Sequence, residues 1–180
     1  MKLEQTADGS YTLYVPELDE HYHSVKGALT ESQHIFIEMG LKHSPVSEPH
    51  ILEIGLGTGL NAFLTLLSAE ETRRKVHYTG IERYPLAEET LKQLDYPRLI
   101  GKQHEEDYYA IHRAPWNTET EVSPWFTLHK IEDDFTRLST RRKAAVPPFP
   151  YTISSTLMPS LPKNNPKCGN NLFSILYTRY

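Results

Sequence analysis

Cysteine is nearly absent from this sequence of 180 residues, and long apolar runs are missing altogether. The single Cys168 excludes an intrachain disulfide framework and a zinc site built from four cysteines. No window reaches the roughly 18–20 apolar residues that a membrane span needs, and Met1–Thr6 lacks the apolar stretch of a signal peptide. We therefore expect a protein of the reducing cytoplasm that does not enter a membrane.

An excess of charge of one sign is also lacking, because 19 basic and 23 acidic residues give a formal net charge of -4. This total provides no electrostatic argument for a nucleic-acid partner. The length fits one domain or part of one. We expect residues 1–140 to form that domain.

The first 45 residues predict a small β element followed by a helix. Ser10–Val15 alternates behind the Asp8-Gly9 turn and indicates a short hairpin or edge strand. Gly27–Leu41 has apolar residues at helical spacing, with Thr30 as a candidate cap and Gly40 near the end. This segment predicts one amphipathic helix.

Strands and helices then alternate along the chain. The strand His50–Ile54 leads through glycines into a helix at 60–69, and a second strand at 76–81 ends at Glu82. Pro85 fits the first turn of a helix that runs to Leu94. A helix at 104–112 and a third strand at 125–131 complete the pattern. The predicted fold class is α/β, a Rossmann-like, doubly wound parallel sheet of the kind found in class I methyltransferases.

The composition changes after Thr140. The basic run Arg141–Lys143 is followed by five prolines between Pro147 and Pro162. Proline cannot donate a hydrogen bond to a strand ladder, so no core strand is expected here. The sequence predicts an irregular tail over residues 141–180.

Glycines at positions 55, 57 and 59 form a G-x-G-x-G motif between a strand and a helix. Glycine lets the backbone turn sharply and approach a ligand, and the helix N-terminus offers free N–H groups. A dinucleotide site favours G-x-G-x-x-G, but Leu60 stands where the third glycine is due. The spacing of Gly55, Gly57 and Gly59 therefore favours S-adenosylmethionine over NAD, and a tight turn without a ligand is the alternative.

Acidic residues close the second and third strands. Glu82 lies where a carboxylate accepts hydrogen bonds from both ribose hydroxyls of a nucleoside cofactor, although it also fits a helix cap before Pro85. Asp133 and Asp134 end the third strand at the same sheet edge. One of them is expected to contact the adenine amino group, and an N-cap for the next turn is the alternative.

Histidine and aromatic residues elsewhere have structural explanations. His21 and His23 are spaced i and i+2 without a nearby third ligand, so a metal site is not expected. Tyr108, Tyr109 and Trp116 provide rings that can stack on a base, but such residues more often pack in cores.

Several segments together resemble the MnmD-type tRNA methyltransferases, which correspond to the methyltransferase half of the bifunctional MnmC enzymes. The segments are Asp8–Leu13, Asp19–Ser24, Glu31-Ser32, Glu53–Asn61 and Gly80–Glu82. The resemblance implies methylation of the aminomethyl group on the wobble uridine of tRNA, with S-adenosylmethionine as the methyl donor. It also implies that an FAD-dependent enzyme acts upstream.

The same resemblance implies roles for further residues. Glu53 and Asn61 join the glycine loop in cofactor binding, and Tyr22, Ser24 and Glu31 take part in substrate binding. In this family the substrate amine is the nucleophile, so the enzyme mainly aligns nitrogen, methyl and sulfur and provides a route for a proton.

The family's next motif, Asp-Ala-Phe-Ala-Pro, is absent, and no catalytic residue is assigned. Ser155–Gly169 stands where this motif is due. Read one nucleotide earlier, codons allowed for this stretch yield Tyr-Phe-Asp-Ala-Phe-Ala-Pro-Glu-Lys-Gln-Pro-Glu-Met-Trp, the family's continuation. The sequence therefore predicts a frameshift between about Thr140 and Tyr151, and a natural proline-rich tail is the alternative.

Three functions follow from these observations. The leading one is a tRNA methyltransferase by ancestry, whose activity in this chain is uncertain without the missing motif. The second is a catalytically inactive remnant that binds cofactor or tRNA. The third, an NAD-dependent dehydrogenase, is disfavoured by Leu60. The oligomeric state does not follow from the sequence.

Overall fold

The computed structural model describes residues 1–135, 151–153 and 175–177, and its main element is a sheet of four strands. The strand order is β4 (His50–Ile54), β5 (Val76–Glu82), β7 (Phe126–Glu132) and β6 (Glu119–Ser123). Strands β4, β5 and β7 are parallel, whereas β6 is antiparallel to β7. The predicted α/β class with a parallel sheet is confirmed.

Strand β6 was not expected. It follows the helical region and joins β7 as an antiparallel hairpin, with a register shift between Glu121 and Ser123. Its sequence, Glu-Thr-Glu-Val-Ser, has charged residues at alternate positions, as an exposed edge strand requires. The third unit of the sheet is therefore a hairpin rather than a plain crossover from helix to strand.

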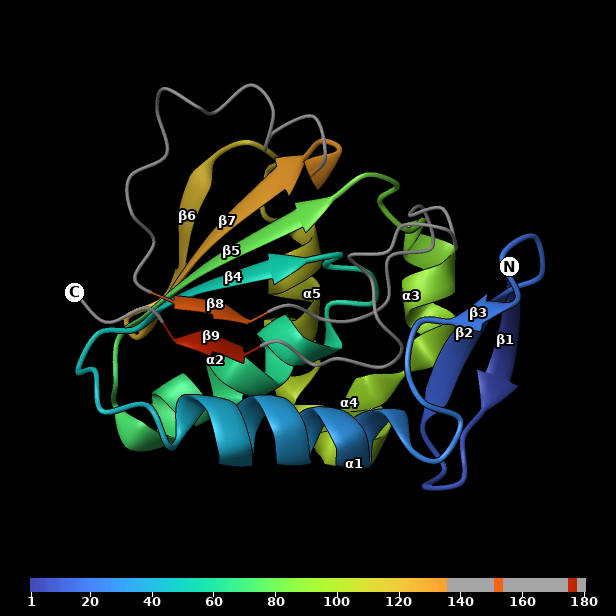
Figure 1. Ribbon diagram of the computed structural model, residues 1–180, viewed down its shortest axis with the longest axis horizontal. Helices are drawn as coiled ribbons and strands as arrows, with labels where there is room; N and C mark the ends of the chain where they lie inside the picture. Colours follow the sequence, from blue (N-terminus) through green and yellow to red (C-terminus); the bar gives the residue numbers. More distant parts are fainter. Residues whose placement is uncertain (136–150, 154–174, 178–180) are drawn as a thin grey trace.

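The helices cover the sheet and carry the chain between strands (Figure 1). Helix α2 (Leu60–Thr72) packs against β5, β7 and the long helix formed by α1 (Ala28–Ser32) and η1 (Gln33–Leu41). Because α2 has neighbours on several sides, residues around most of its circumference are buried. The remaining helices are α3 (Glu88–Leu94), α4 (Tyr96–Ile100), η2 (Lys102–His104) and α5 (Glu105–Arg113).

Two helix starts differ from the sequence prediction. The first helix begins at Ala28, and Thr30 is not its cap. Its first N–H groups are capped by side chains of the preceding β turn, because Thr30 N donates to Asp8 Oδ2 at 2.8 Å and Leu29 N donates to Ser10 Oγ at 3.2 Å. Helix α3 begins at Glu88, so Pro85 lies before the helix and not in its first turn.

A second, smaller sheet lies at one end of the domain. It contains β1 (Lys2–Gln5), β2 (Tyr11–Val15) and β3 (Glu20–His21), all antiparallel. The predicted hairpin is confirmed, and Figure 1 shows this N-terminal sheet beyond the carboxyl ends of the parallel strands. This position brings it to the edge where parallel sheets bind ligands.

The tail contains two short strands that the sequence analysis did not expect. Strand β8 (Tyr151–Ile153) pairs with β9 (Ile175–Tyr177), and β8 lies beside β4 (Figure 1). The expectation of an irregular tail is wrong for these two segments, which are free of proline and rich in β-branched and aromatic residues. The frameshift is predicted between about Thr140 and Tyr151, and both this interval up to residue 150 and the stretch Ser155–Gly169 lie outside the described residues.

The described residues contain no helix that is long and apolar enough to cross a membrane. Their core lies between the sheet, α2 and α5. It includes fully buried aromatic side chains from three helices and two strands, namely Phe63, Tyr78, Tyr96, Tyr108 and Phe126.

Candidate cofactor site

The glycine loop joins β4 to α2 through three left-handed backbone positions. The φ angles are 84° at Gly55, 53° at Gly57 and 71° at Gly59. The amides of Gly55 and Leu56 donate to the carbonyl of Ile81 at 2.8 and 3.1 Å, which holds the loop against the end of β5. The loop therefore has the sharp turn expected from the G-x-G-x-G spacing.

Gly57 lies directly against the ring of Tyr22. A Cβ atom on Gly57 would be 2.9 Å from Tyr22 Cδ1, closer than carbon atoms pack. The sequence interpretation placed ligand in the space beside Gly57, but an aromatic side chain from the segment after β3 occupies it. Burial, followed by the nearby Glu82 carboxylate, raises the pKa of Tyr22 to about 12, so its hydroxyl keeps its proton at neutral pH.

Glu82 connects the loop to the end of β5. Its side chain is almost fully buried, and its two carboxylate oxygens accept hydrogen bonds from Gly57 N at 2.9 Å and from Tyr84 N at 2.8 Å. Neither donor belongs to the first turn of α3, so the helix-cap alternative for Glu82 is wrong. Glu82 also lines the cavity described next.

A cavity of about 290 Å³ opens at the carboxyl edge of the parallel strands. This volume lies near the lower end of the roughly 300–1,000 Å³ typical of ligand pockets. The strand ends contribute one side and the N-terminal sheet the other. The lining residues are Met1, Val15, Leu18, Tyr22, Ile54, Gly55, Ile81, Glu82, Arg83, Tyr84, Asp133, Asp134 and Phe135.

Both aspartates at the end of β7 reach this cavity. Asp133 N donates to the carbonyl of Glu82 at 3.1 Å, which extends the β5–β7 pairing beyond the strands. Asp134 forms an ion pair with Arg83 at 2.9 Å, and the Arg83 guanidinium lies 4.9 Å from the centre of the Tyr84 ring. Asp133 Oδ1 accepts Asp134 N at 2.7 Å. The two carboxylates thus differ, since among the described residues only that of Asp134 is paired with a cation.

Glu53 and Asn61 do not line the cavity, although both were expected to bind cofactor. Glu53 is 1% exposed and accepts hydrogen bonds from Asn61 Nδ2 and from the Tyr78 hydroxyl, both at 2.7 Å. Burial raises the pKa of Glu53 to about 8 against these two hydrogen bonds, which lower it. These hydrogen bonds join β4 to α2 and β5, the elements next to the glycine loop. At pH 7, Glu53 is largely protonated.

This protonation predicts a pH-dependent stability that Glu53→Gln removes. Unfolding lowers the pKa of Glu53 from about 8 to about 4.5, so the folded state loses stability as the pH rises through this interval. Glu53→Gln stays neutral, and a flip of the Asn61 amide would bring Oδ1, which has no partner among the described residues, into position to accept the new amide N–H. As the pH rises from 5 to 8, we expect the free energy of unfolding of the variant to increase by on the order of 2–4 kcal/mol relative to that of wild type.

Urea unfolding at these two pH values measures the effect, with the exposed Glu121→Gln as the control. Equal pH dependence in wild type and Glu53→Gln would show that Glu53 is ionised in the folded protein.

Of the three expected substrate-binding residues, the structure brings Tyr22 to the cavity and leaves the other two outside its lining. Ser24 N donates to Glu31 Oε2 at 3.0 Å, and Ser24 Oγ accepts Lys26 N at 3.2 Å. Ser24 and Glu31 therefore hold the turn that leads into α1.

The core alternative is confirmed for Tyr108. Its side chain is fully buried, lies 5.2 Å from the ring of Phe63 and donates its hydroxyl to the carbonyl of Thr58 at 3.0 Å. The ring of Trp116 lies 4.5 Å from the Lys130 ammonium, which is buried and donates to the carbonyl of His112. Both Tyr108 and Trp116 therefore have protein partners.

Eight lining residues were missed by the sequence analysis, among them the strand residues Ile54 and Ile81. Arg83 and Tyr84 follow Glu82 directly at the strand end, so their position carried a usable signal. Met1, Val15 and Leu18 line the cavity because the N-terminal sheet folds over the sheet edge, and Phe135 follows the two aspartates. No local pattern predicts the placement of that small sheet.

Comparison with solved structures supports the fold. The crystal structure of MNMC2 from Aquifex aeolicus matches with a TM-score of 0.61, covering 79% of this chain and 45% of that chain at 24% identity. At this identity the match defines a shared fold. No protein-family model matches the chain.

Curated relatives carry the name tRNA 5-methylaminomethyl-2-thiouridine biosynthesis bifunctional protein MnmC. The protein from Magnetococcus marinus is 34% identical over 94 residues, which cover 48% of this chain and 14% of the relative. The protein from Burkholderia mallei is 33% identical over 119 residues, which cover 63% of this chain and 16% of the relative. The resemblance to the MnmC proteins is therefore confirmed, and it covers a small part of their length.

Proposed function

We propose that this chain is the cofactor-binding part of an S-adenosylmethionine-dependent methyltransferase that acts on the aminomethyl group of the wobble uridine in tRNA. One observation carries the proposal. Gly55, the first of three loop glycines with positive φ, lines one cavity at the carboxyl edge of a parallel sheet together with Glu82, whose carboxylate accepts Gly57 N. The names of the MnmC relatives support the choice of tRNA as substrate.

The residues at this cavity fit a nucleoside cofactor. Glu82 supplies a carboxylate for ribose hydroxyls, and the cavity wall from Ile54 and Ile81 is apolar. Asp133 and Asp134 supply acceptors for an adenine amino group at the neighbouring strand end. S-adenosylmethionine, when bound, supplies an electrophilic methyl group on a sulfonium.

The chain's own task is to bind and orient that methyl donor. The substrate amine provides the electron pair for the new N–C bond, the C–S bond breaks, and the ammonium product must lose a proton. None of the described residues is assigned as the base. The proposed reaction therefore depends on residues at or beyond the position where the Asp-Ala-Phe-Ala-Pro motif is due.

A methyl-transfer assay tests this function. Labelled S-adenosylmethionine and tRNA carrying the unmethylated aminomethyl uridine are incubated with the chain, and labelled tRNA would show that the chain is an active methyltransferase. If cofactor binds but no label is transferred, the second function, an inactive cofactor-binding remnant, replaces the first. The NAD alternative stays disfavoured because Leu60 stands where the third glycine of a dinucleotide site is due.

The frameshift remains a prediction about the gene. We expect the DNA across codons 140–170 to encode the family motif in the reading frame that starts one nucleotide earlier. A single-base insertion or deletion between codons 140 and 151, found by sequencing the gene and close relatives, is the predicted result. Relatives that encode the same proline-rich stretch in frame would show that the tail is natural.

A further inference from the structure

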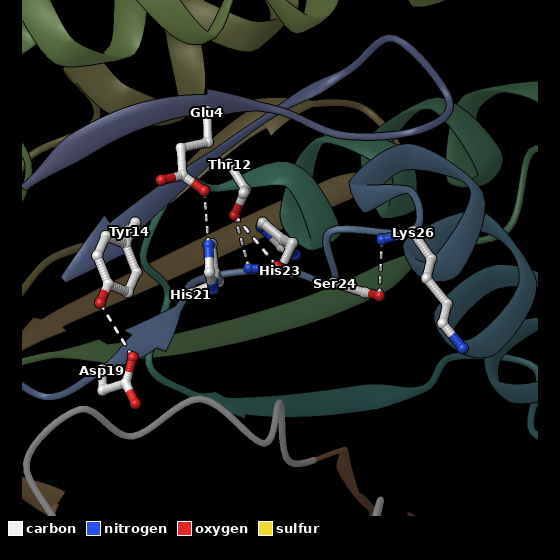
Figure 2. A network of polar contacts seen from close by, with 8 residues as sticks. All are labelled: Glu4, Thr12, Tyr14, Asp19, His21, His23, Ser24 and Lys26. Atoms are coloured by element: carbon white, nitrogen blue, oxygen red, sulfur yellow. Dashed lines mark hydrogen bonds and ion pairs between the residues drawn. The ribbon is translucent and has the colours of Figure 1, made fainter. Parts of the chain in front are cut away.

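The side chain of His23 crosses from the segment after β3 to the glycine loop. Its Nε2 atom lies 2.7 Å from Thr58 Oγ1. The backbone of His23 is fixed by Thr12 on β2, since His23 N donates to Thr12 Oγ1 at 2.9 Å and this hydroxyl donates to the His23 carbonyl at 3.3 Å. Figure 2 shows the contact between Thr12 and His23. His23 therefore joins the N-terminal sheet to the loop.

Thr58 is a buried residue between two left-handed glycines. It is 1% exposed, and Gly57 and Gly59 on either side have positive φ. Its hydroxyl also accepts Leu60 N at 3.4 Å, and its carbonyl accepts the Tyr108 hydroxyl at 3.0 Å. The contact with His23 therefore acts in the middle of the glycine loop, whose first glycine, Gly55, lines the cavity.

The neighbouring side chains of this segment point to different places. His21 Nε2 lies 2.8 Å from Glu4 Oε2 on β1, away from the loop (Figure 2). Tyr22 lines the cavity against Gly57. The His21 and His23 rings do not converge on one ligand, and His23 is the member of the segment whose side chain is bonded to the loop.

Burial lowers the pKa of the His23 ring to about 4, so the ring is neutral at pH 7. A neutral imidazole has one nitrogen that accepts and one that donates. Nε2 can then accept the proton of the Thr58 hydroxyl while the hydroxyl oxygen accepts Leu60 N. This arrangement satisfies the buried hydroxyl and fixes its orientation.

We propose that His23 is a positioning residue of the cofactor loop, which through the Thr58 hydroxyl fixes the turn at Gly57–Gly59 and links it to the N-terminal sheet. The role in cofactor binding rests on the proposed function, whereas the role in fixing the loop does not. The N-terminal sheet contributes Val15 to the cavity lining. The same contact therefore fixes the position of this wall of the cavity relative to the glycine loop.

Two substitutions at His23 test this role. His23→Ala removes the contact with Thr58, whereas His23→Gln keeps a side-chain group that can bond to the Thr58 hydroxyl. In the ligand-free chain, we expect amide hydrogen exchange at Gly59 and Leu60 to become roughly 5–10-fold faster in His23→Ala, because the variant loses one hydrogen bond that stabilises the loop. His23→Gln should stay close to wild type. His21→Ala, which removes a neighbouring histidine contact, is the matched control and should leave these amides unchanged.

The second readout is the affinity for S-adenosylhomocysteine, measured by calorimetry. We expect a weakening of roughly 5–10-fold in His23→Ala, recovery in His23→Gln and no change in His21→Ala. Thr58→Val has nearly the same shape as threonine and removes the hydroxyl alone. If His23 acts through this hydroxyl, His23→Ala should add little to the effect of Thr58→Val.

Each outcome decides a separate point. Unchanged exchange and affinity in His23→Ala, or full additivity with Thr58→Val, would overturn the role of His23. If wild type binds no S-adenosylhomocysteine, the proposed function fails and the exchange experiment alone decides the role of His23. If His23→Ala does not fold, exchange at Gly59 in Thr58→Val decides, because Leu60 N loses its own acceptor in that variant. Unchanged exchange at Gly59 would overturn the proposal, and faster exchange there would support it.

Discussion

Gly57→Val should lower the affinity of the chain for S-adenosylhomocysteine by about a hundredfold or more. Gly57 has a φ angle of 53°, which costs a side-chain-bearing residue roughly 1–2 kcal/mol, and valine is especially unsuited to it. Its first side-chain atom would also lie 2.9 Å from the Tyr22 ring, which forms part of the cavity wall. The loop and the ring must move apart, so the cavity changes shape. Calorimetric titration measures the loss.

Gly9→Val is the matched control for Gly57→Val. Gly9 has a φ angle of 82° in the β1–β2 turn, and an added Cβ would meet nothing within 4 Å. This variant carries similar backbone strain without a contact in the cavity. We expect both variants to lose thermal stability and Gly57→Val alone to lose affinity. Unchanged affinity in Gly57→Val would mean that the ligand does not depend on this loop.

Glu82→Ala should weaken binding of S-adenosylhomocysteine by roughly 1–3 kcal/mol, or about 5–150-fold. The variant removes the acceptor proposed for the ribose hydroxyls and leaves Gly57 N without its partner at 2.9 Å. Glu82→Gln keeps one acceptor oxygen without the charge and should lie between alanine and wild type.

A ligand variant separates the two effects of Glu82. If the carboxylate binds the ribose, wild type should bind S-adenosylhomocysteine lacking a ribose hydroxyl less tightly than the parent compound. Glu82→Ala should then bind the two compounds with the same affinity. If the carboxylate only orders the loop, the missing hydroxyl costs the same in both proteins. Glu132→Ala is the control, because Glu132 pairs with Glu82 in register on β7 but is exposed and does not line the cavity.

The sequence was sufficient for the parts of the fold that depend on local pattern. The strands at His50–Ile54 and 76–82 are short segments rich in apolar, β-branched and aromatic residues, and the first is bounded by Pro49 and Gly55. The glycine loop follows from spacing, because glycine tolerates the left-handed backbone that the turn requires. Glu82 was placed correctly because the end of a parallel strand fixes which edge a residue reaches.

Other features depend on contacts between distant segments. Thr30 has the side chain of a cap, but Asp8, 22 residues earlier, reaches the helix start instead. Glu53 lies next to the loop in sequence, yet alternation along β4 points its side chain toward Tyr78 and Asn61 in the interior. The turn at Ser24 resembles a binding segment in sequence but bonds to α1. Position along the chain does not determine these partners.

The most direct test of the proposed site is a calorimetric comparison of S-adenosylmethionine and NADH as ligands of the wild-type chain. The glycine loop with Leu60 at its end, Glu82 and the cavity at the strand edge predict that S-adenosylmethionine binds to one site per chain and binds more tightly than NADH. Tighter binding of NADH, or no binding of S-adenosylmethionine to a chain shown by circular dichroism to be folded, would contradict the account.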